Sequence, residues 1–377
     1  MKDDKICVIG SGIAGIMTLY FLDKFGSKKL TIFDKEVLAS GTTGKSAGIV
    51  VTHLFDELDI ELSKRTIKIL DEIDKKSKYK FLKKFQTVTG LINDREKAKI
   101  ESLLKKKFIE FETLTLKDIK KIYPLFKEEK TYIVSDDGLY VDVGELLYSI
   151  YVYLKSKNHE FRFFNEVEGF EIKQNRVKSL ITKRGKFYFD KYLIATGIWS
   201  KEILKKHDIK INVKPYRTQA AILEFKREID LPIYNDLSYG IYLRKELKKD
   251  VLIGDGTERK ESDIYNFKSY NDEEFLFSLS EKLPKILDGA EEFLLKGGWA
   301  FLCLATPDKK PIVSKVEDIE NLFLFCGFNG LGIMRAPALS EILAECIIDN
   351  LPLPKEFSLE RFKDLKDFEI KEGFYPD

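Results

Sequence analysis

The stretch Lys5-Ile-Cys-Val-Ile-Gly-Ser-Gly-Ile-Ala-Gly-Ile-Met-Thr-Leu-Tyr-Phe-Leu22 joins an apolar run to a glycine-rich turn and a second apolar segment. Residues 6–9 predict a buried parallel strand. Gly10, Gly12 and Gly15 form the pattern Gly-x-Gly-x-x-Gly, and apolar residues at helical spacing follow. Such glycines allow a tight turn, close approach of the backbone to a pyrophosphate, and close packing of helix on strand. The stretch therefore predicts a dinucleotide-binding β-α-β unit.

A second predicted strand, residues 30–33, ends at the acid Asp34. A carboxylate there accepts a hydrogen bond from a ribose 2′-hydroxyl and repels a 2′-phosphate. The helix after the glycines turns its free N–H groups and its positive dipole end toward the phosphates. These features favour FAD or NAD over NADP. We expect Ile13 and Ala14, at the start of the helix, and Lys35, beside the acid, to contact the dinucleotide too.

The composition argues against several other classes of protein. The 377 residues include 64 Lys+Arg and 62 Asp+Glu, so the net charge of +2 provides no strong field for binding nucleic acid. A metal site has little support, because the chain has three histidines and its four cysteines lack Cys-x-x-Cys spacing. Cys7, Cys326 and Cys346 lie in apolar patterns that are typical of a core. No apolar stretch reaches about 18 residues, so we expect a soluble, cytoplasmic protein without a transmembrane segment.

The charged fraction is high and glutamine is scarce. Charged residues make up 33% of the chain, and the only glutamines are Gln86, Gln174 and Gln219. This bias suggests a protein from a thermophile. An AT-rich genome produces a similar bias toward Lys, Ile and Phe, so both explanations stay open.

The rest of the chain alternates helical and strand-like patterns without internal repeats. Helical periodicity covers residues 56–82, 94–107, 141–155, 272–287 and 333–349. Strand-like patterns cover residues 161–164, 167–172, 177–182, 186–189, 191–195, 216–225, 239–244, 250–255 and 322–326. The strands between 216 and 255 suggest an antiparallel sheet, whereas the C-terminal part returns to α/β character.

Seven segments together are similar to one family. They are the N-terminal β-α-β unit, Gly41-Thr-Thr-Gly-Lys-Ser-Ala-Gly48, Ala195-Thr-Gly-Ile-Trp-Ser200, Val213-Lys-Pro-Tyr-Arg-Thr-Gln219, Ile253-Gly-Asp-Gly-Thr-Glu258, Trp299 through Thr306-Pro-Asp308, and Gly327-Phe-Asn-Gly-Leu-Gly-Ile-Met-Arg-Ala-Pro337. In this order they resemble the D-amino-acid oxidase superfamily of flavoproteins over almost the whole chain, within its glycine/sarcosine oxidase and D-amino-acid dehydrogenase branch.

The resemblance implies FAD as the cofactor, not NAD, and an α/β fold with two interleaved domains. A Rossmann-like FAD-binding domain would comprise residues 1–82, 135–215 and 300–377. An α+β substrate domain, residues 83–134 and 216–299, would cover the isoalloxazine ring with an antiparallel sheet.

The resemblance also places a set of residues at the flavin. They are Thr42, Thr43, Lys45, Ser46, Ala47, Gly48, Val167, Thr196, Gly197, Trp199, Gly327, Asn329, Gly330, Leu331, Gly332 and Ile333. Glycines 330 and 332 would let the backbone approach the pyrimidine edge, and the following helix N-terminus would stabilise negative charge at N1 and C2=O of the reduced flavin. An ordinary strand-to-helix turn is the alternative for this segment, and a solvated side chain is the alternative for Lys45.

The chain departs from the family pattern at two places. Amino-acid-oxidising members often carry a carboxylate-binding Arg five residues before the Asp of Thr-Pro-Asp, where this chain has Cys303. A thiol cannot replace a bidentate guanidinium, so either the substrate differs or another arginine takes over, the candidates being Arg217, Arg244, Arg259 and Arg335. Relatives with covalent FAD use a His in the loop at Lys45-Ser46 or a Cys at the position of Phe301, so we expect non-covalent FAD.

The candidate catalytic residues are Tyr242, Arg244, Arg335 and His53. Tyr242 and Arg244 alternate along a strand and share a face, so they would form a carboxylate clamp if that face covers the cofactor. A solvated Arg at a sheet edge is the alternative for Arg244. His53 would reach the substrate, or else serve as a hydrogen-bonded structural residue.

The predicted activity is oxidation of the C–N bond of a small amino or imino acid, of the glycine, sarcosine, D-amino acid or proline type. Hydride passes to flavin N5, water hydrolyses the imine, and oxygen, a dye or a quinone reoxidises the flavin. Two alternatives stay open: an FAD-dependent 2-hydroxy-acid or glycerol-phosphate dehydrogenase, and a flavin-carrying subunit of a larger complex. The sequence leaves the oligomeric state open.

Overall fold

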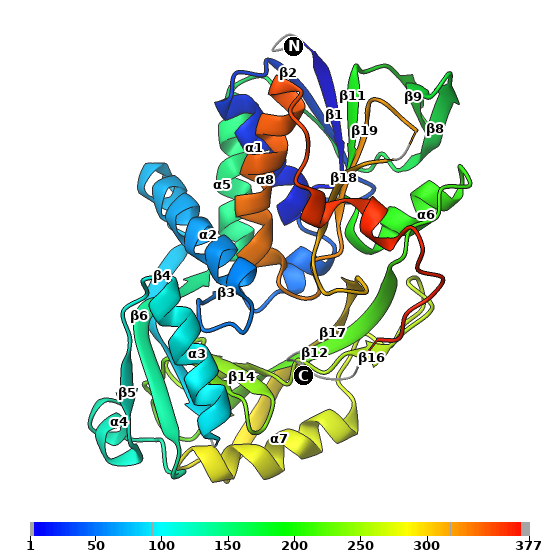
Figure 1. The fold of residues 1–377 in the computed structure, drawn as a ribbon. Helices are drawn as coiled ribbons and strands as arrows, with labels where there is room; N and C mark the ends of the chain where they lie inside the picture. The colour runs from blue at the N-terminus through cyan, green and yellow to red at the C-terminus, as the bar shows by residue number, and fades with distance from the viewer. Residues whose placement is uncertain (1–3, 92, 317, 371–377) are drawn as a thin grey trace.

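A parallel sheet carries the N-terminal motif. The computed structural model describes residues 4–91, 93–316 and 318–370 (Figure 1). The strand order of this sheet is β18-β19-β11-β1-β2-β7, and all neighbours are parallel except the pair β18–β19. Its strands are β1 (Lys5–Ile9), β2 (Lys29–Phe33), β7 (Glu160–Arg162), β11 (Lys191–Ile194), β18 (Ile312–Lys315) and β19 (Leu322–Cys326).

Strand β1 is buried on both faces, which explains its unbroken apolar run. Ile6 and Val8 pack in the cluster formed with α1 (Ile13–Lys24), α5 (Val143–Ser156) and α8 (Gly332–Asp349). Cys7 and Ile9 point to the opposite face, because successive side chains of a strand alternate. That face is covered by α6 (Ser200–Lys205) and a three-stranded sheet of β8 (Val167–Lys173), β9 (Arg176–Thr182) and β10 (Gly185–Phe187) (Figure 1).

A larger sheet lies beyond the C-terminal ends of the parallel strands (Figure 1). Its order is β16-β12-β15-β14-β13-β4-β6-β3, with β17 on β12 and β5 on β6. The strands are β3 (Ile49–Val50), β4 (Leu82–Leu91), β5 (Glu112–Leu114), β6 (Thr131–Val141), β12 (Lys214–Phe225), β13 (Ile233–Asp236), β14 (Ile241–Lys245), β15 (Asp250–Gly254), β16 (Arg259–Lys260) and β17 (Phe293–Ala305). The predicted antiparallel arrangement is confirmed for every pair except β4–β13, which is parallel.

The described part of the chain contains four further helices. They are α2 (Glu57–Lys76), α3 (Asp94–Lys106), α4 (Leu116–Ile122) and α7 (Glu273–Ile286). Side chains from α4 and α7 join one apolar cluster with the sheet, and α2 packs against α8 beside the parallel sheet. The mixed α/β fold with a Rossmann-like part and a second, mostly antiparallel part agrees with the predicted fold class.

The strands do not end at the domain boundaries predicted from the sequence. The boundary at residue 135 falls inside β6, because Ser135 and Gly138 stay paired with β4 across a bulge between Phe85 and Thr87. Strand β3 lies in the segment predicted for the flavin domain, yet it pairs with β6 of the larger sheet. The domain division therefore stays a prediction, and residues 1–3, 92, 317 and 371–377 of its ranges lie outside the described residues.

Three expectations from composition can be compared with the described part of the chain. Cys7, Cys326 and Cys346 are buried free thiols, as expected for core residues, and Cys303 is a buried free thiol too. Within the described ranges, no group of three or more His, Cys, Asp and Glu side chains is placed to hold a metal ion. No helix among these residues is long and apolar enough to cross a membrane.

Candidate active site

A cavity of about 740 Å³ extends from the glycine turn after β1 to the larger sheet. This volume is in the usual range of about 300–1,000 Å³ for ligand and cofactor sites. Every residue predicted to contact the cofactor lines it except Gly15, Lys45 and Gly48. Segments that are far apart in the sequence therefore converge on one site.

The three glycines of the turn have different surroundings. A Cβ on Gly10, whose φ is +104°, would lie 2.4 Å from the carbonyl oxygen of Ala195. A Cβ on Gly15 would lie 1.9 Å from the carbonyl oxygen of Gly10, so Gly15 allows α1 to pack against the turn and does not face the cavity. A Cβ on Gly12 would meet only the hydroxyl of Thr43, at 3.0 Å. Gly12 therefore borders space that a pyrophosphate can occupy.

Asp34 follows β2 directly and borders the adenosine end of the cavity. Its Oδ2 accepts hydrogen bonds from the N–H and the hydroxyl of Ser11, both at 2.7 Å. Nearby, the Lys35 ammonium lies 3.9 Å from the ring centroid of Trp199, and Trp199 Nε1 is buried without a hydrogen-bond partner among the described residues. A bound dinucleotide can provide the missing acceptor, so these residues fit FAD.

Replacement of Asp34 by alanine is expected to weaken FAD binding. Loss of a charge-assisted hydrogen bond costs on the order of 1.5–3 kcal/mol, which corresponds to roughly a 10- to 150-fold higher dissociation constant. Titration of the apoprotein with FAD measures this dissociation constant. Ser11→Ala is the matched control, because it removes the side-chain contact with Asp34 but keeps the carboxylate. FMN, which lacks the adenosine, should bind both variants equally, and an unchanged FAD dissociation constant would show that Asp34 does not contact the ribose.

The segment between β19 and α8 forms a second backbone cradle. Gly327 and Gly330 have φ values of +74° and +80°, and Asn329 has +52°. The Asn329 side chain accepts a hydrogen bond from the N–H of Thr306 at 2.9 Å and donates to the Thr306 hydroxyl at 2.9 Å. Helix α8 begins without a side-chain cap, so its first N–H groups can stabilise an anion.

The loop before β3 contributes hydroxyls, but not the Lys45 ammonium. The Thr42 hydroxyl donates to the carbonyl of Leu302 at 2.6 Å, and the Thr43 hydroxyl accepts from the N–H of Ile13 at 3.2 Å. The Lys45 carbonyl accepts from Trp299 Nε1 at 2.9 Å, and its ammonium lies 5.9 Å from the Phe267 ring centroid. The structure therefore places the Lys45 side chain away from the cavity, contrary to the expected flavin contact.

Gly48 also lies outside the cavity lining, because the backbone closes around it. Its φ is +66°, and a Cβ there would lie 2.2 Å from the carbonyl oxygen of Val141. The glycine thus allows the chain to enter β3 directly against β6. Gly48 therefore serves the packing of the chain at the edge of the larger sheet, and the structure does not support its predicted contact with the flavin.

The expected clamp of Tyr242 and Arg244 is not formed. Tyr242 lines the cavity, and burial raises the pKa of its hydroxyl, which therefore stays protonated. Arg244 is 3% exposed and does not line the cavity. Its Nε donates to the carbonyl of Ala47 at 2.7 Å, and its guanidinium pairs with Glu246 and lies 3.9 Å from the Tyr140 ring centroid. The 46–48 backbone covers this end of the strand face, which sequence alternation alone could not show.

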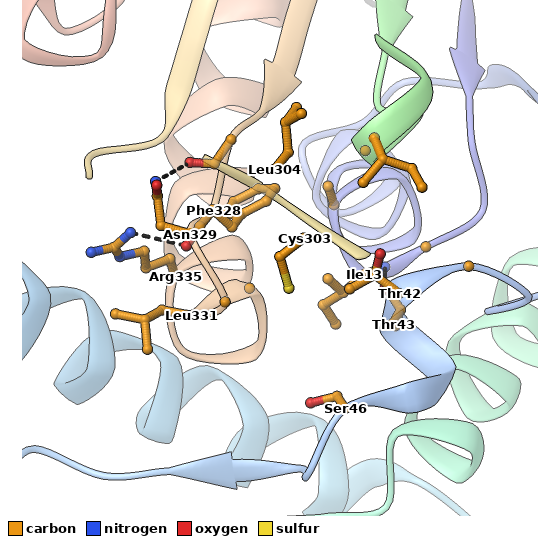
Figure 2. A pocket seen from close by; sticks show the side chains of 18 of the residues that line it. Ile13, Thr42, Thr43, Ser46, Cys303, Leu304, Phe328, Asn329, Leu331 and Arg335 are labelled. Atoms are coloured by element: carbon orange, nitrogen blue, oxygen red, sulfur yellow. Dashed lines mark hydrogen bonds between the residues drawn. The ribbon is translucent and has the colours of Figure 1, made fainter. Parts of the chain in front are cut away.

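Arg335 lines the cavity, but its donors are already used. Its Nε and Nη2 form a bidentate pair with the carboxylate of Asp59, at 2.7 Å each. Its Nη1 donates to the carbonyl of Phe328 at 3.0 Å (Figure 2) and to the carbonyl of Lys309 at 2.8 Å. Arg335 therefore joins α8 to α2 and to the turn after β17, which argues against a role as the carboxylate ligand.

The other two arginine candidates lie behind the cavity wall. Arg217 and Arg259 converge with Lys268 on Asp272. Although burial opposes it, hydrogen bonds from Lys268 and Arg217 lower the pKa of Asp272 to about 2. Neither arginine lines the cavity. On β12 the neighbours of Arg217, Tyr216 and Thr218, point to the cavity, because successive side chains of a strand alternate.

His53 lines the cavity as a buried, hydrogen-bonded ring. Its Nδ1 lies 2.9 Å from the Thr89 hydroxyl and its Nε2 lies 2.8 Å from the Ser135 hydroxyl. Burial lowers the pKa of His53 to about 4, although the charge of Asp137 opposes this shift. A neutral ring bridging β4 and β6 matches the structural alternative.

The buried state of His53 makes the stability of the protein pH-dependent. The unfolded chain binds a proton at His53 near pH 6.5, whereas the folded chain does so only near pH 4. The free energy of unfolding should therefore fall by up to about 3 kcal/mol as the pH decreases from about 6.5 to 4. Denaturant titrations over this range measure the slope. His53→Asn should have a smaller slope, and equal slopes in both proteins would contradict the assignment.

Glu258, Lys309, Thr218 and Asn235 line the cavity but were not predicted as site residues. Glu258 is 7% exposed, and burial raises its pKa while Lys309 lowers it. Glu258 ends one of the family-like segments, and Lys309 directly follows another. Their positions at the ends of these segments could have indicated in the sequence that they belong to the site. The alternation of Tyr216 and Thr218 along β12 was a second signal.

The glycine turn, the acid after β2 and the uncapped α8 together define a flavin-binding oxidoreductase site. The family model described as FAD dependent oxidoreductase matches residues 5–346. The chain therefore belongs to this family of FAD-dependent oxidoreductases.

Relatives and solved structures support the same placement. The chain is 25% identical to 4-methylaminobutanoate oxidase (formaldehyde-forming) of Paenarthrobacter nicotinovorans over 92% of this chain and 44% of that protein. It is 22% identical to a D-amino acid dehydrogenase of Helicobacter pylori, over 92% and 95% of the two chains. L-proline dehydrogenase from P. horikoshii superimposes with a TM-score of 0.88 at 26% identity, covering 97% of this chain and 99% of that one. The chain spans less than half the length of the curated relatives it matches first.

Proposed function

We propose that this chain oxidises the C–N bond of a small amino or imino acid to an imine, which water then hydrolyses. The observation that carries this proposal is the continuation of the cavity beyond the two glycine cradles. There the wall is formed by Thr218, Asn235 and Tyr242, from three strands of the larger sheet. Hydroxyl, amide and phenol groups beside apolar side chains suit a small polar substrate.

The names of the similar proteins support an amine substrate. They include an oxidase of a methylamino acid, dehydrogenases of sarcosine and D-amino acids, and a structurally similar L-proline dehydrogenase. Each is named for a substrate with a carboxylate and a carbon-bound nitrogen. At 22–26% identity they support the substrate class but do not select one compound.

The side chains of this site bind, orient and exclude water. When bound, FAD supplies the acceptor for the hydride that leaves the substrate Cα. The free N–H groups at the start of α8 stabilise negative charge on a ligand placed against them. Phe301, Met334 and Tyr242 line the cavity and exclude water from the part that they cover, and burial keeps the Tyr242 hydroxyl protonated.

Anaerobic mixing with candidate substrates tests the proposal. Amino acids, N-methylglycines and proline are expected to bleach the flavin of the holoenzyme, whereas 2-hydroxy acids and glycerol phosphate are not. Bleaching by hydroxy acids alone would replace the proposal with alcohol oxidation. Turnover of the isolated chain with a dye acceptor is also expected, and its absence with every substrate would favour a flavin-carrying subunit.

A further inference from the structure

A loosely paired acid and base face each other in the cavity wall. Glu258 lies between β15 and β16, and Lys309 lies in the turn between β17 and β18. Glu258 is 7% exposed, and its ion-pair partner among the described residues is the Lys309 ammonium, at 3.9 Å. No described residue donates a hydrogen bond to its carboxylate. Glu258 lines the cavity, so a cationic ligand there can offer this carboxylate a closer partner than the Lys309 ammonium.

The backbone of Lys309 is held in an unusual conformation. Its φ is +57°, in the left-handed region that side chains other than glycine seldom adopt. Arg335 donates to the Lys309 carbonyl at 2.8 Å, and Asp59 fixes Arg335 through its bidentate pair. Such a conformation persists only where the surroundings impose it, and it is enriched at functional sites. Arg335 and Asp59 thus act as positioning residues for Lys309.

The other cations of the cavity wall are engaged elsewhere or face away from Glu258. The Lys35 ammonium lies over Trp199, and the Lys206 ammonium donates to the carbonyl of Glu168 at 2.9 Å. The donors of Arg335 are used by Asp59 and backbone carbonyls. Lys310 shares the turn with Lys309, but Lys309 is the lysine that pairs with Glu258.

The pair lies beside the predicted flavin edge. Burial raises the pKa of Cys303 to about 12, and the charge of Glu258 contributes to this rise. Glu258 and Cys303 both line the cavity, and the Cys303 sulfur points into the space bounded by Leu331, Ile13 and Ser46 (Figure 2). Cys303 stands where the resemblance implies a carboxylate-binding Arg, and a thiol cannot bind a carboxylate in that way, so a substrate carboxylate would require another cation close by.

We propose that Lys309 and Glu258 are specificity residues that bind the two charges of a zwitterionic substrate, Lys309 its carboxylate and Glu258 its ammonium, which loses a proton to water before the hydride leaves. This inference rests on the proposed oxidation of amino or imino acids. The ligand exchanges one weak ion pair for two close, charge-assisted contacts. A 2-hydroxy acid satisfies only Lys309 and leaves the Glu258 carboxylate without a cation, so the pair selects amines over alcohols.

Ligands that the enzyme cannot oxidise test this recognition by perturbing the flavin spectrum of the holoenzyme. 2-Aminoisobutyrate carries both charges and has no hydrogen on Cα, pivalate carries only the carboxylate, and tert-butylamine carries only the ammonium. Lys309→Met is expected to raise the dissociation constants of 2-aminoisobutyrate and pivalate about 10- to 100-fold and to leave that of tert-butylamine unchanged. Glu258→Gln is expected to raise the dissociation constants of 2-aminoisobutyrate and tert-butylamine but not that of pivalate. Lys315→Met, on the exposed side of β18, is the control, and equal FAD content shows that each variant folds.

The inference is overturned if both variants bind all three ligands as the wild type does, or if the losses do not follow ligand charge. A loss in Lys310→Met in place of Lys309→Met would overturn it too. If 2-aminoisobutyrate does not perturb the spectrum, the KM of an amino acid that bleaches the flavin is measured in both variants instead. An unchanged KM in both variants would refute the role of Lys309 and Glu258 in substrate binding. Failure of the proposed function is different, because then no amino acid bleaches even the wild type.

Discussion

Gly12→Val is expected to abolish FAD retention while the chain stays folded. The valine Cβ lies in the direction of the Thr43 hydroxyl, 3.0 Å away, and its methyl groups extend into the space at the start of α1. That space is where the pyrophosphate reaches the free N–H groups of the helix. Because the clash is with the ligand and not with a buried backbone atom, the effect on binding should exceed the effect on folding.

Flavin absorbance per mole of purified protein, together with circular dichroism, measures this result. The wild type should be yellow and release intact FAD on denaturation, since Phe301 and the loop at Lys45-Ser46 offer no Cys or His for attachment. Gly297→Val is the matched control, because no atom lies within 4 Å of a Cβ at Gly297 and valine suits a strand. Undiminished FAD occupancy in Gly12→Val would contradict the placement of the pyrophosphate. Flavin that stays with the denatured wild-type chain would contradict non-covalent binding.

The rate of anaerobic flavin reduction at subsaturating amino acid should rise with pH. Hydride leaves Cα readily only when the nitrogen carries a lone pair, and below its pKa the amine is protonated. The apparent second-order rate constant should thus rise up to about tenfold per pH unit between about pH 6 and 10, and level off near the pKa of the substrate or its complex. Stopped-flow spectroscopy over this range measures it. A flat profile would argue against an amine that must lose a proton.

Two controls separate the substrate's proton from one on the protein. His53→Asn should preserve the profile, because the pKa of His53 is about 4 and the ring is neutral throughout the range. If the pH dependence of flavin reduction disappears in this variant, His53 would instead be the proton acceptor. A hydroxy acid has no ammonium proton to lose, so bleaching by a hydroxy acid with a flat profile would favour the alcohol-oxidising alternative.

Local spacing explains which parts of the site were predictable. The strand, the three glycines and the start of α1 occupy consecutive residues, so their geometry follows from backbone sterics and short-range packing. Asp34 was predictable for the same reason, since it follows β2 directly and β2 pairs beside β1. The 327–332 segment likewise leads from a buried strand into a helix, and both patterns are visible in sequence.

The roles of the charged side chains depended on partners that are distant in sequence. Arg335 bonds Asp59, 276 residues away, and Arg244 bonds the carbonyl of Ala47, 197 residues away. Alternation placed Tyr242 and Arg244 on one strand face correctly, but it could not show that the 46–48 backbone covers part of that face.

The sequence by itself determined the β-α-β unit with its glycine turn, the acid that follows β2 and the mixed α/β class, because each depends on short-range periodicity and backbone conformation. Only the tertiary structure decided which groups the cations pair with. It paired Arg244 with Glu246 and Arg335 with Asp59, turned the Lys45 ammonium toward Phe267, and brought Glu258 within 3.9 Å of Lys309. The physical reason is that charge pairing depends on distance through space, which the chain sets only when both sheets have folded around the cavity.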